Sequence, residues 1–172
     1  MADTVTLDYS LRSTVTEILD TTDVPAGSTN QGRTLKADEF NVSGQLTSTT
    51  TPPVDFATMK KVTLTGGTVT IDLTAAEKSA GRTQDLTGEK NVSLIIECPT
   101  TNSGAATIAP GSANPYVLFG AGQSISLDPG EVLEKQMVKG KAASKAAVSA
   151  TVKNLDFTGT SGDFVHIQMT FG

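Results

Sequence analysis

The chain has 172 residues, a formal net charge of -5 and a single cysteine, Cys98. This length fits one domain with a buried core, alone or with an extended arm, and one cysteine excludes an internal disulfide. An acidic surface repels phosphate backbones, which argues against nucleic acid as a main partner.

Threonine dominates the composition, with 27 residues, and most of them lie beside Val, Leu or Ile. A β-branched side chain loses rotamer freedom in a helix and packs well on a pleated sheet. The polar opening lacks the pattern of a signal peptide, and the apolar runs are far shorter than a bilayer span. We therefore expect a soluble β protein that folds in the compartment where it is made.

The N-terminal third predicts strands separated by a polar arm. Residues 3–19 alternate weakly and predict one or two strands, and residues 20–35 have almost no apolar content and predict a loop or arm. Residues 36–47 predict another strand, with Phe40, Val42 and Leu46 facing inward. The Thr- and Pro-rich segment 47–53 predicts an extended linker to the rest of the chain.

The clearest local pattern is a Gly-Gly pair between two alternating segments, 60–65 and 68–73. Such a pair supplies the positive φ angles that a two-residue hairpin turn requires. We therefore predict a hairpin whose two strands are neighbours in one sheet. Its register would place Leu64 opposite Val69 and Val62 opposite Ile71.

Further strands are predicted at hairpin spacing, and Asp128 to Glu131 predicts a type II turn. A helical turn is possible at 75–78, and 131–137 is compatible with strand or helix. The remaining expected strands are 92–98, 105–108, 116–119, 124–127, 148–157 and 163–171. The pattern as a whole predicts an all-β protein: an antiparallel β-sandwich or jelly-roll-like barrel with an extended N-terminal arm. Residues 1–53 would hold the N-terminal strands and arm, and residues 54–172 the sandwich core.

Catalytic and metal chemistry finds little support in the sequence. His166 is the only histidine, and it lies in the middle of a strand on the predicted polar face, so we interpret it as a surface residue and predict no enzyme activity. One His and one Cys cannot build a zinc site, and the scattered aspartates form no EF-hand-like loop, so no metal or cofactor is predicted. Cys98 ends an apolar strand and is interpreted as a core residue, with a reactive thiol as the alternative.

The sequence suggests two kinds of surface contact, one with an acidic partner and one with a sugar. The lysines at 135, 139, 141 and 145 predict either a contact with an acidic partner surface or a solvated loop. Sugar sites stack aromatic rings on sugar faces. With no Trp in the chain, Tyr9 and Tyr116 are the plausible platforms.

Several segments resemble a family of tailed-phage virion proteins. The resemblance rests on the opening Val5 to Leu11, on Thr107 to Tyr116, on Ser124 to Glu131, and on the turn Leu155 to Thr160 before a last alternating strand. It covers residues 3–11 and 62–172. Within this family, the most similar functional type is the capsid decoration (cement) protein, a small β-domain that binds the outside of a head shell, often as a trimer.

The resemblance implies a structural protein with no catalytic residues and no cofactor. It implies a homotrimer, assembled in the host cytoplasm, that binds across neighbouring major capsid protein subunits on the capsid exterior, without nucleic acid or membrane as partners. A tail or fibre module that binds a host surface glycan is the alternative. Contact residues are expected in or directly beside the matched segments, namely Leu7, Tyr9, Leu11, Arg12, Asn114 and Tyr116.

Overall fold

The structure, a computed structural model, describes residues 5–11, 14–18, 32–36, 42–77, 82–137, 140 and 142–172; for residues 11, 14–18, 32–36 and 42 it describes the backbone alone. Contacts divide the chain into two units, Asp8–Gln45 and the remainder, Met1–Leu7 with Leu46–Gly172. The boundary at Leu46 lies before the segment that the sequence assigned to a linker.

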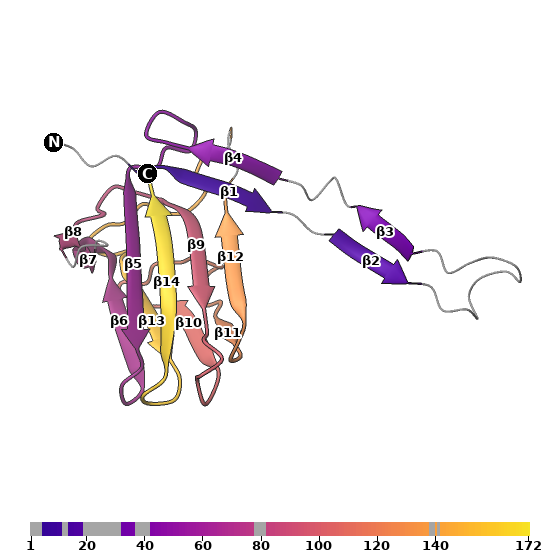
Figure 1. Cartoon of the computed structure of the whole chain (residues 1–172). Coiled ribbons are helices and arrows are strands. Elements are labelled where there is room, and N and C mark those ends of the chain that lie inside the picture. Colours follow the sequence, from indigo (N-terminus) through magenta and orange to yellow (C-terminus); the bar gives the residue numbers. More distant parts are fainter. Residues whose placement is uncertain are drawn as a thin grey trace, which may run out of the picture. The chain divides into compact units, whose positions relative to one another are not determined.

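The larger unit contains two four-stranded antiparallel sheets, stacked face to face (Figure 1). Sheet I has the order β12-β9-β14-β5, and sheet II has the order β11-β10-β13-β6. The strands of sheet I are β5 (Phe56–Thr63), β9 (Asn91–Glu97), β12 (Val132–Gln136) and β14 (Phe164–Phe171). Those of sheet II are β6 (Thr68–Asp72), β10 (Ala106–Pro110), β11 (Ile125–Leu127) and β13 (Asn154–Thr158).

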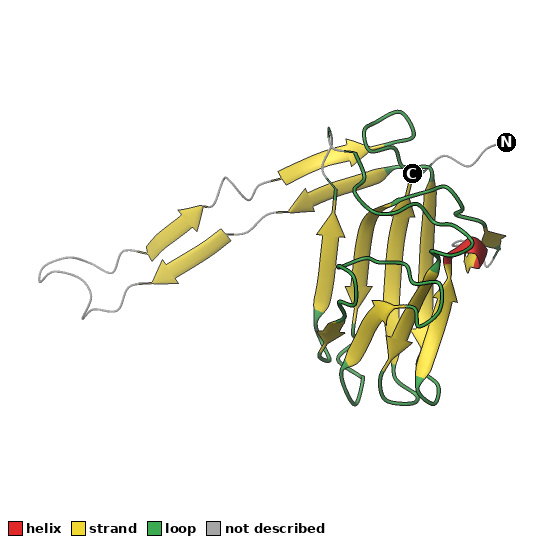
Figure 2. Ribbon diagram, turned by 180° about the vertical axis from the view of Figure 1, so that it is seen from behind, coloured by secondary structure: helices red, strands yellow, loops and turns green. Residues whose placement is uncertain are grey.

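The pairing of these eight strands is that of a jelly roll. In chain order the first strand pairs with the last, the second with the seventh, the third with the sixth and the fourth with the fifth, all antiparallel. The chain also crosses between the two sheets at most of its connections, as two interlocked Greek keys require. The predicted all-β sandwich of jelly-roll type is therefore confirmed (Figure 2).

The core lies between the two sheets because alternate residues of each strand point inward. In β14 the four residues predicted to face inward, Val165, Ile167, Met169 and Phe171, are all buried, whereas His166 is exposed. Thr170 departs from the pattern: it is buried as well, and its hydroxyl lies 2.7 Å from that of Ser93 on β9. The pair satisfies both hydroxyls, which would otherwise be costly to bury.

The predicted hairpin at Gly66 and Gly67 is wrong, although both of its strands exist. The strand β5 belongs to sheet I and pairs with β14, whereas β6 belongs to sheet II and pairs with β13. The two glycines do have positive φ angles, 63° and 128°, so the turn was placed correctly. The turn connects the two sheets as an arch. Val62 and Ile71 therefore lie in the shared core on facing sheets, and not side by side in one sheet. Period-two alternation buries the same residues in both arrangements, and so cannot distinguish them.

The backbone hydrogen bonds before the arch belong to sheet I. Leu64 N–H donates to Asp163 O at 2.8 Å, and Gly162 N–H donates to Leu64 O at 2.8 Å. These bonds continue the pairing of β5 with β14 into the turn between β13 and β14, whereas β6 pairs with β13 in the other sheet. Both backbone groups of Leu64 therefore have a partner, as buried backbone groups require.

Three further expectations are corrected. Segment 47–53 is a compact turn and not an extended linker, because Thr47 O accepts from Val54 N–H at 3.0 Å and from Thr50 N–H at 3.2 Å. Segment 116–119 forms no strand. The expected helical turn at 75–78 is a 3-10 helix, η2 (Leu73–Ala75), followed by the short pair β7 (Ala76–Glu77) and β8 (Thr83–Gln84).

Two expectations about turns and strands are confirmed. In the segment that was ambiguous between strand and helix, the chain forms β12, because its backbone pairs with β9. The type II turn is present: Glu131 N–H donates to Asp128 O at 2.9 Å, and Gly130 has a φ of 94°. Glycine adopts this positive φ without the strain that a Cβ would cause.

The smaller unit is a two-stranded antiparallel ribbon in two sections. One section pairs β1 (Leu7–Leu11) with β4 (Val42–Leu46), and the other pairs β2 (Thr14–Ile18) with β3 (Gly32–Lys36). In the second section Val15 lies opposite Leu35 and Glu17 opposite Arg33. The sequence predicted β1, β2 and β4, but it assigned residues 32–35 to a loop. Phe40 lies outside the described residues.

Candidate functional site

Tyr116, one of the predicted surface contacts, is completely buried in the sandwich core. Its ring packs against Phe171 with centroids 6.4 Å apart, and its hydroxyl accepts the backbone N–H of Asn91 at 3.0 Å. Burial raises the pKa of Tyr116 to about 12, which the Asn91 N–H partly opposes. A ring in this position cannot stack on a glycan, so its predicted role as a surface platform is wrong.

Other predicted contact residues have different outcomes. Asn114 is exposed, with a φ of 50°, on a loop of the sandwich, and its backbone carbonyl accepts from Lys153 and Asn154 N–H groups. Leu7 and Tyr9 are buried, at 9% and 8% exposure. Tyr9 packs directly on Gly44. A Cβ added to Gly44 would lie only 2.6 Å from the phenol oxygen of Tyr9. Leu11 is described only as backbone in β1, and Arg12 lies outside the described residues.

The exposed face of sheet I carries the single histidine. His166 Nδ1 lies 3.1 Å from Glu97 Oε2 on the neighbouring strand, and both side chains are half exposed. The His166 ring packs on Phe164, with centroids 5.2 Å apart, and the Lys61 ammonium lies 3.7 Å from the centre of the Phe164 ring. These contacts form a surface cluster of a cation, an aromatic ring and an acid across β5, β14 and β9.

The same face exposes apolar side chains that the sequence analysis did not single out. Met59 on β5 is 55% exposed and Val132 on β12 is 60% exposed. The registers place both at outward positions, opposite Gln168 of β14 and Glu97 of β9 respectively. Their placement depends on which strand neighbours which, and the sequence could not supply that information.

Cys98 is buried at the end of β9, and Asn102 Nδ2 approaches its sulfur at 3.3 Å. Asn102 mainly serves the backbone of β14: its amide donates to Phe164 O at 2.7 Å, and its carbonyl accepts Phe164 N–H at 3.2 Å. The interpretation of Cys98 as a core residue therefore agrees with its burial. Asn102 extends the sheet by mimicking a strand partner.

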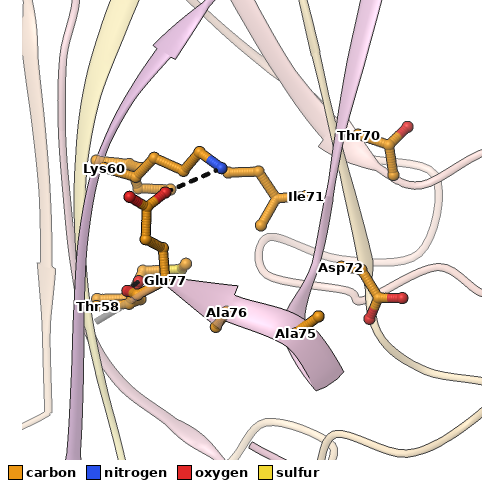
Figure 3. Close-up of a pocket in the computed structure, with 10 residues that line it drawn as sticks. Thr58, Lys60, Thr70, Ile71, Asp72, Ala75, Ala76 and Glu77 are labelled. Carbon is orange, nitrogen blue, oxygen red and sulfur yellow. Dashed lines mark hydrogen bonds and ion pairs between the residues drawn. The ribbon is translucent and has the colours of Figure 1, made fainter. Parts of the chain in front are cut away.

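The two open edges of the sandwich each contain a hollow. The first lies where β5 and β6 diverge, has a volume of about 200 Å³, and has a floor that includes Ile71, Ile167 and Met169 (Figure 3). Lys60 and Glu77 form an ion pair of 3.2 Å beside it. Thr58 Oγ1 donates to Glu77 O at 2.5 Å, which ties β7 to β5. The hollow is small, and its polar side chains have partners within the protein, including Thr70 with Asp156 and Asp72 with Lys153.

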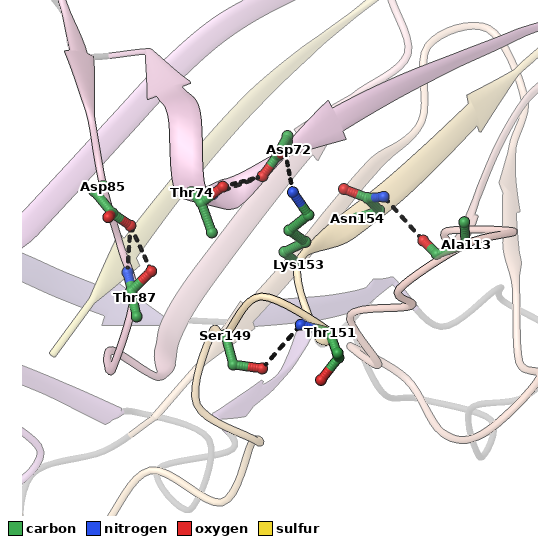
Figure 4. A network of polar contacts seen from close by, with 9 residues as sticks. All are labelled: Asp72, Thr74, Asp85, Thr87, Ala113, Ser149, Thr151, Lys153 and Asn154. Carbon is green, nitrogen blue, oxygen red and sulfur yellow. Dashed lines mark hydrogen bonds and ion pairs between the residues drawn. The ribbon is translucent and has the colours of Figure 1, made fainter.

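Behind this edge, Asp72 links β6 to the segment before β13 (Figure 4). Its carboxylate accepts from Lys153 Nζ at 2.6 Å and from Thr74 N–H at 2.8 Å. Burial raises the pKa of Asp72, but the hydrogen bonds from Lys153 and Thr74 outweigh it and hold the pKa below its ordinary value. These groups satisfy one another, which is typical of a structural contact.

The second hollow lies at the opposite edge, between β11 and β12, and has a volume of about 420 Å³. Its wall contains the side chain of Lys135, whose Nζ donates to Leu118 O at 2.9 Å. Burial, together with the neighbouring Lys145 ammonium, lowers the pKa of Lys135 to about 8. The remaining lining residues are Phe119, Gln123, Ser124, Ile125, Leu133 and Glu134.

Comparison with known protein families, curated proteins and solved structures found no match to this chain. In the parts of the chain that the structure describes, no group of three or more His, Cys, Asp or Glu side chains could hold a metal ion. The described residues also contain no helix long and apolar enough to cross a membrane.

Proposed function

We propose that this protein is a structural component of a phage virion that decorates the outside of the head and stabilises it by binding across neighbouring major capsid protein subunits. The proposal takes the family resemblance as its starting point. The observation that carries it is the ribbon of Asp8–Gln45, a separate unit built from paired strands.

A two-stranded ribbon is marginally stable on its own in water, because it has too little apolar surface to bury. In the described residues, β2 and β3 pair only with each other. Each strand therefore has an outer edge whose N–H and C=O groups can pair with a further strand. Such a ribbon gains stability when it is placed on a partner, and this is what a protein that fastens subunits together requires.

The sandwich offers a second surface for association. On the outer face of sheet I, Met59 and Val132 lie among polar residues, together with the cluster of Lys61, Phe164 and His166. Apolar and aromatic side chains surrounded by polar ones are typical of a protein interface. Jelly rolls also occur in viral capsid domains, although they occur in lectins too, so the fold supports the proposal by analogy alone.

A protein that binds only the assembled shell stabilises that shell by mass action. The proposed unit is a homotrimer, in which three ribbons would reach three neighbouring subunits at once. Multivalent attachment increases the overall affinity well beyond that of a single contact. The proposed role needs no catalytic group and no cofactor.

The test is cosedimentation of the purified chain with preformed heads of the phage whose genome encodes it, together with light scattering for the oligomeric state. We expect a trimer and saturable binding to heads. A matched variant replaces residues 8–45 with a short Gly-Ser loop. It should keep the β signal of the sandwich, whose hydrophobic core cluster runs from Val62 to Phe171, and should lose head binding. A monomer that does not bind heads would refute the proposal.

The alternative is a tail or fibre module that binds glycan. Such a site needs an exposed aromatic ring, and the ring of Tyr116 is buried. Glycan-array binding, or labelling of tails and not heads by a specific antibody, would restore this alternative.

A further inference from the structure

The two edge strands of sheet I carry opposite charges on the outer face. The strand order β12-β9-β14-β5 puts Lys61 of β5 at one side of this face and Glu134 of β12 at the other (Figure 1). Their sequence neighbours Val62 and Leu133 pack in or against the core, so Lys61 and Glu134 point outward. Neither belongs to an ion pair within the described residues, where the ion pairs are Lys60–Glu77, Lys153–Asp72 and His166–Glu97.

These two charges are too far apart to pair within one molecule. Strands of a sheet lie about 4.8 Å apart, so the three spacings between β5 and β12 separate them by about 14 Å. Each edge strand also exposes an apolar side chain two residues from its charge: Met59 on β5 is 55% exposed, and Val132 on β12 is 60% exposed. Each side of the face therefore combines a charge with an apolar residue, and the two charges have opposite sign.

A second copy of the same face supplies what each side lacks. Two sheets pack face to face with their strands aligned to within about 30°. A twofold axis parallel to the strands places β5 of one copy across β12 of the other, and β14 across β9. Lys61 and Met59 then lie over the segment of the second copy that holds Val132 and Glu134. The ammonium can reach the carboxylate, the two apolar side chains share one buried patch, and both contacts occur twice.

The centre of the face is complementary to itself in the same way. The His166–Glu97 pair spans β14 and β9, the two strands that lie across each other in this arrangement. In the second copy the pair runs in the reverse direction, so each histidine faces a carboxylate of the other copy. A partner of different sequence would need a matching pattern of its own, whereas a second copy already has it.

We propose that the outer face of sheet I binds the same face of a second copy about a twofold axis parallel to its strands, with Lys61 of each copy paired to Glu134 of the other. Four strands about 20 Å long give a patch of roughly 400 Å² per copy. Stable complexes bury about 800 Å² per partner, so this association is weak and depends on concentration. In the proposed trimer the contact joins one trimer to the next, but the inference does not rest on binding to heads.

The experiment is analytical ultracentrifugation of the full chain between about 1 μM and 1 mM, the range in which a small interface associates. We expect the mass of the species present at the lowest concentration to rise at least about twofold, because the contact joins two such species. Lys61→Glu and Glu134→Lys should each weaken this association about tenfold, because each places like charges opposite one another in both symmetric contacts. The double variant Lys61→Glu with Glu134→Lys should restore it.

The variants distinguish this contact from general charge repulsion. Lys61→Glu changes the formal net charge from -5 to -7, and Glu134→Lys changes it from -5 to -3. General repulsion would weaken association in the first variant and strengthen it in the second, whereas the proposed contact is weakened in both. Arg82→Glu makes the same charge change as Lys61→Glu on the exposed segment before β8, and should leave association unchanged.

A mass that does not change with concentration, an unaffected single variant, or a double variant that fails to recover would each overturn the inference. Single variants that keep association but lose head binding would assign the face to the capsid partner, and would also overturn it. A chain that self-associates as described but ignores heads would refute the proposed function alone. Conversely, a chain that binds heads without self-association through this face would refute the present inference alone.

Discussion

The Tyr116 hydroxyl offers a sharp test of the sandwich, because the sequence placed this residue on the surface and the structure places it in the core. In Tyr116→Phe the ring is kept and only the oxygen is lost. The Asn91 N–H, which donates to that oxygen at 3.0 Å, would then be buried without a partner. A buried unsatisfied donor costs about 1–3 kcal/mol. For a domain of this size, each kcal/mol lowers the midpoint of thermal unfolding by about 2–4 °C.

The measurement is urea denaturation of wild type and variant, followed by circular dichroism. Tyr116→Ala removes the ring as well and should cost about 3–5 kcal/mol, as for other large buried aromatic residues. His166→Ala, on the exposed face of sheet I, is the control and should change stability by no more than about 0.5 kcal/mol. Unchanged stability in both Tyr116 variants would show that the ring is not in the core, and would refute the reasoning.

Three further predictions concern individual contacts. The raised pKa of Tyr116 means that its contribution to stability is present below pH about 10, the ordinary pKa of tyrosine, and is lost as pH rises towards about 12. Alkaline titration of unfolding should therefore be less steep in Tyr116→Phe, and an identical pH dependence would contradict this. Asn102→Ala should destabilise the protein by about 2–4 kcal/mol, because it leaves both Phe164 backbone groups without their side-chain partner, and a loss below about 0.5 kcal/mol in urea denaturation would contradict it. The Asp163 carboxylate accepts from Ser103 and Gly104 N–H groups, and these bonds, the Ser103 backbone bond first, hold its pKa below the ordinary value. Its contribution is present above the ordinary pKa of aspartate and is lost as pH falls, so acid unfolding should be less steep in Asp163→Asn than in wild type.

The sequence predicted the positions of the strands of the sandwich better than it predicted which strands pair with each other. Alternation in β14 and the Pro-Gly turn before β12 are local signals, and both were interpreted correctly. The error at Gly66 and Gly67 has a physical cause, since a hairpin and an arch bury the same residues and need the same positive φ angles. The pairing of β5 with β14 and of β6 with β13 distinguishes them, and these pairs join residues far apart in the chain.

The candidate sites were harder to predict for the same reason. Tyr116 was offered as a surface platform because the chain has no Trp, but next to the bridge of Pro115 to Asn154 its side chain is buried in the core. The lysine-rich run was interpreted as either a contact with an acidic partner surface or a solvated loop, and its sequence does not reveal that Lys135 lines a hollow beside β11. Met59 and Val132 share a sheet face only because β14 and β9 lie between their strands.

The central claim is that this jelly roll works by attaching to an assembled shell. Cryo-electron microscopy of intact particles tests it most directly. The account predicts density for the eight-stranded sandwich on the outside of the head, where neighbouring capsid subunits meet, with the ribbon of residues 8–45 paired to a subunit. Density for the sandwich on the tail, or none on the head exterior, would contradict it.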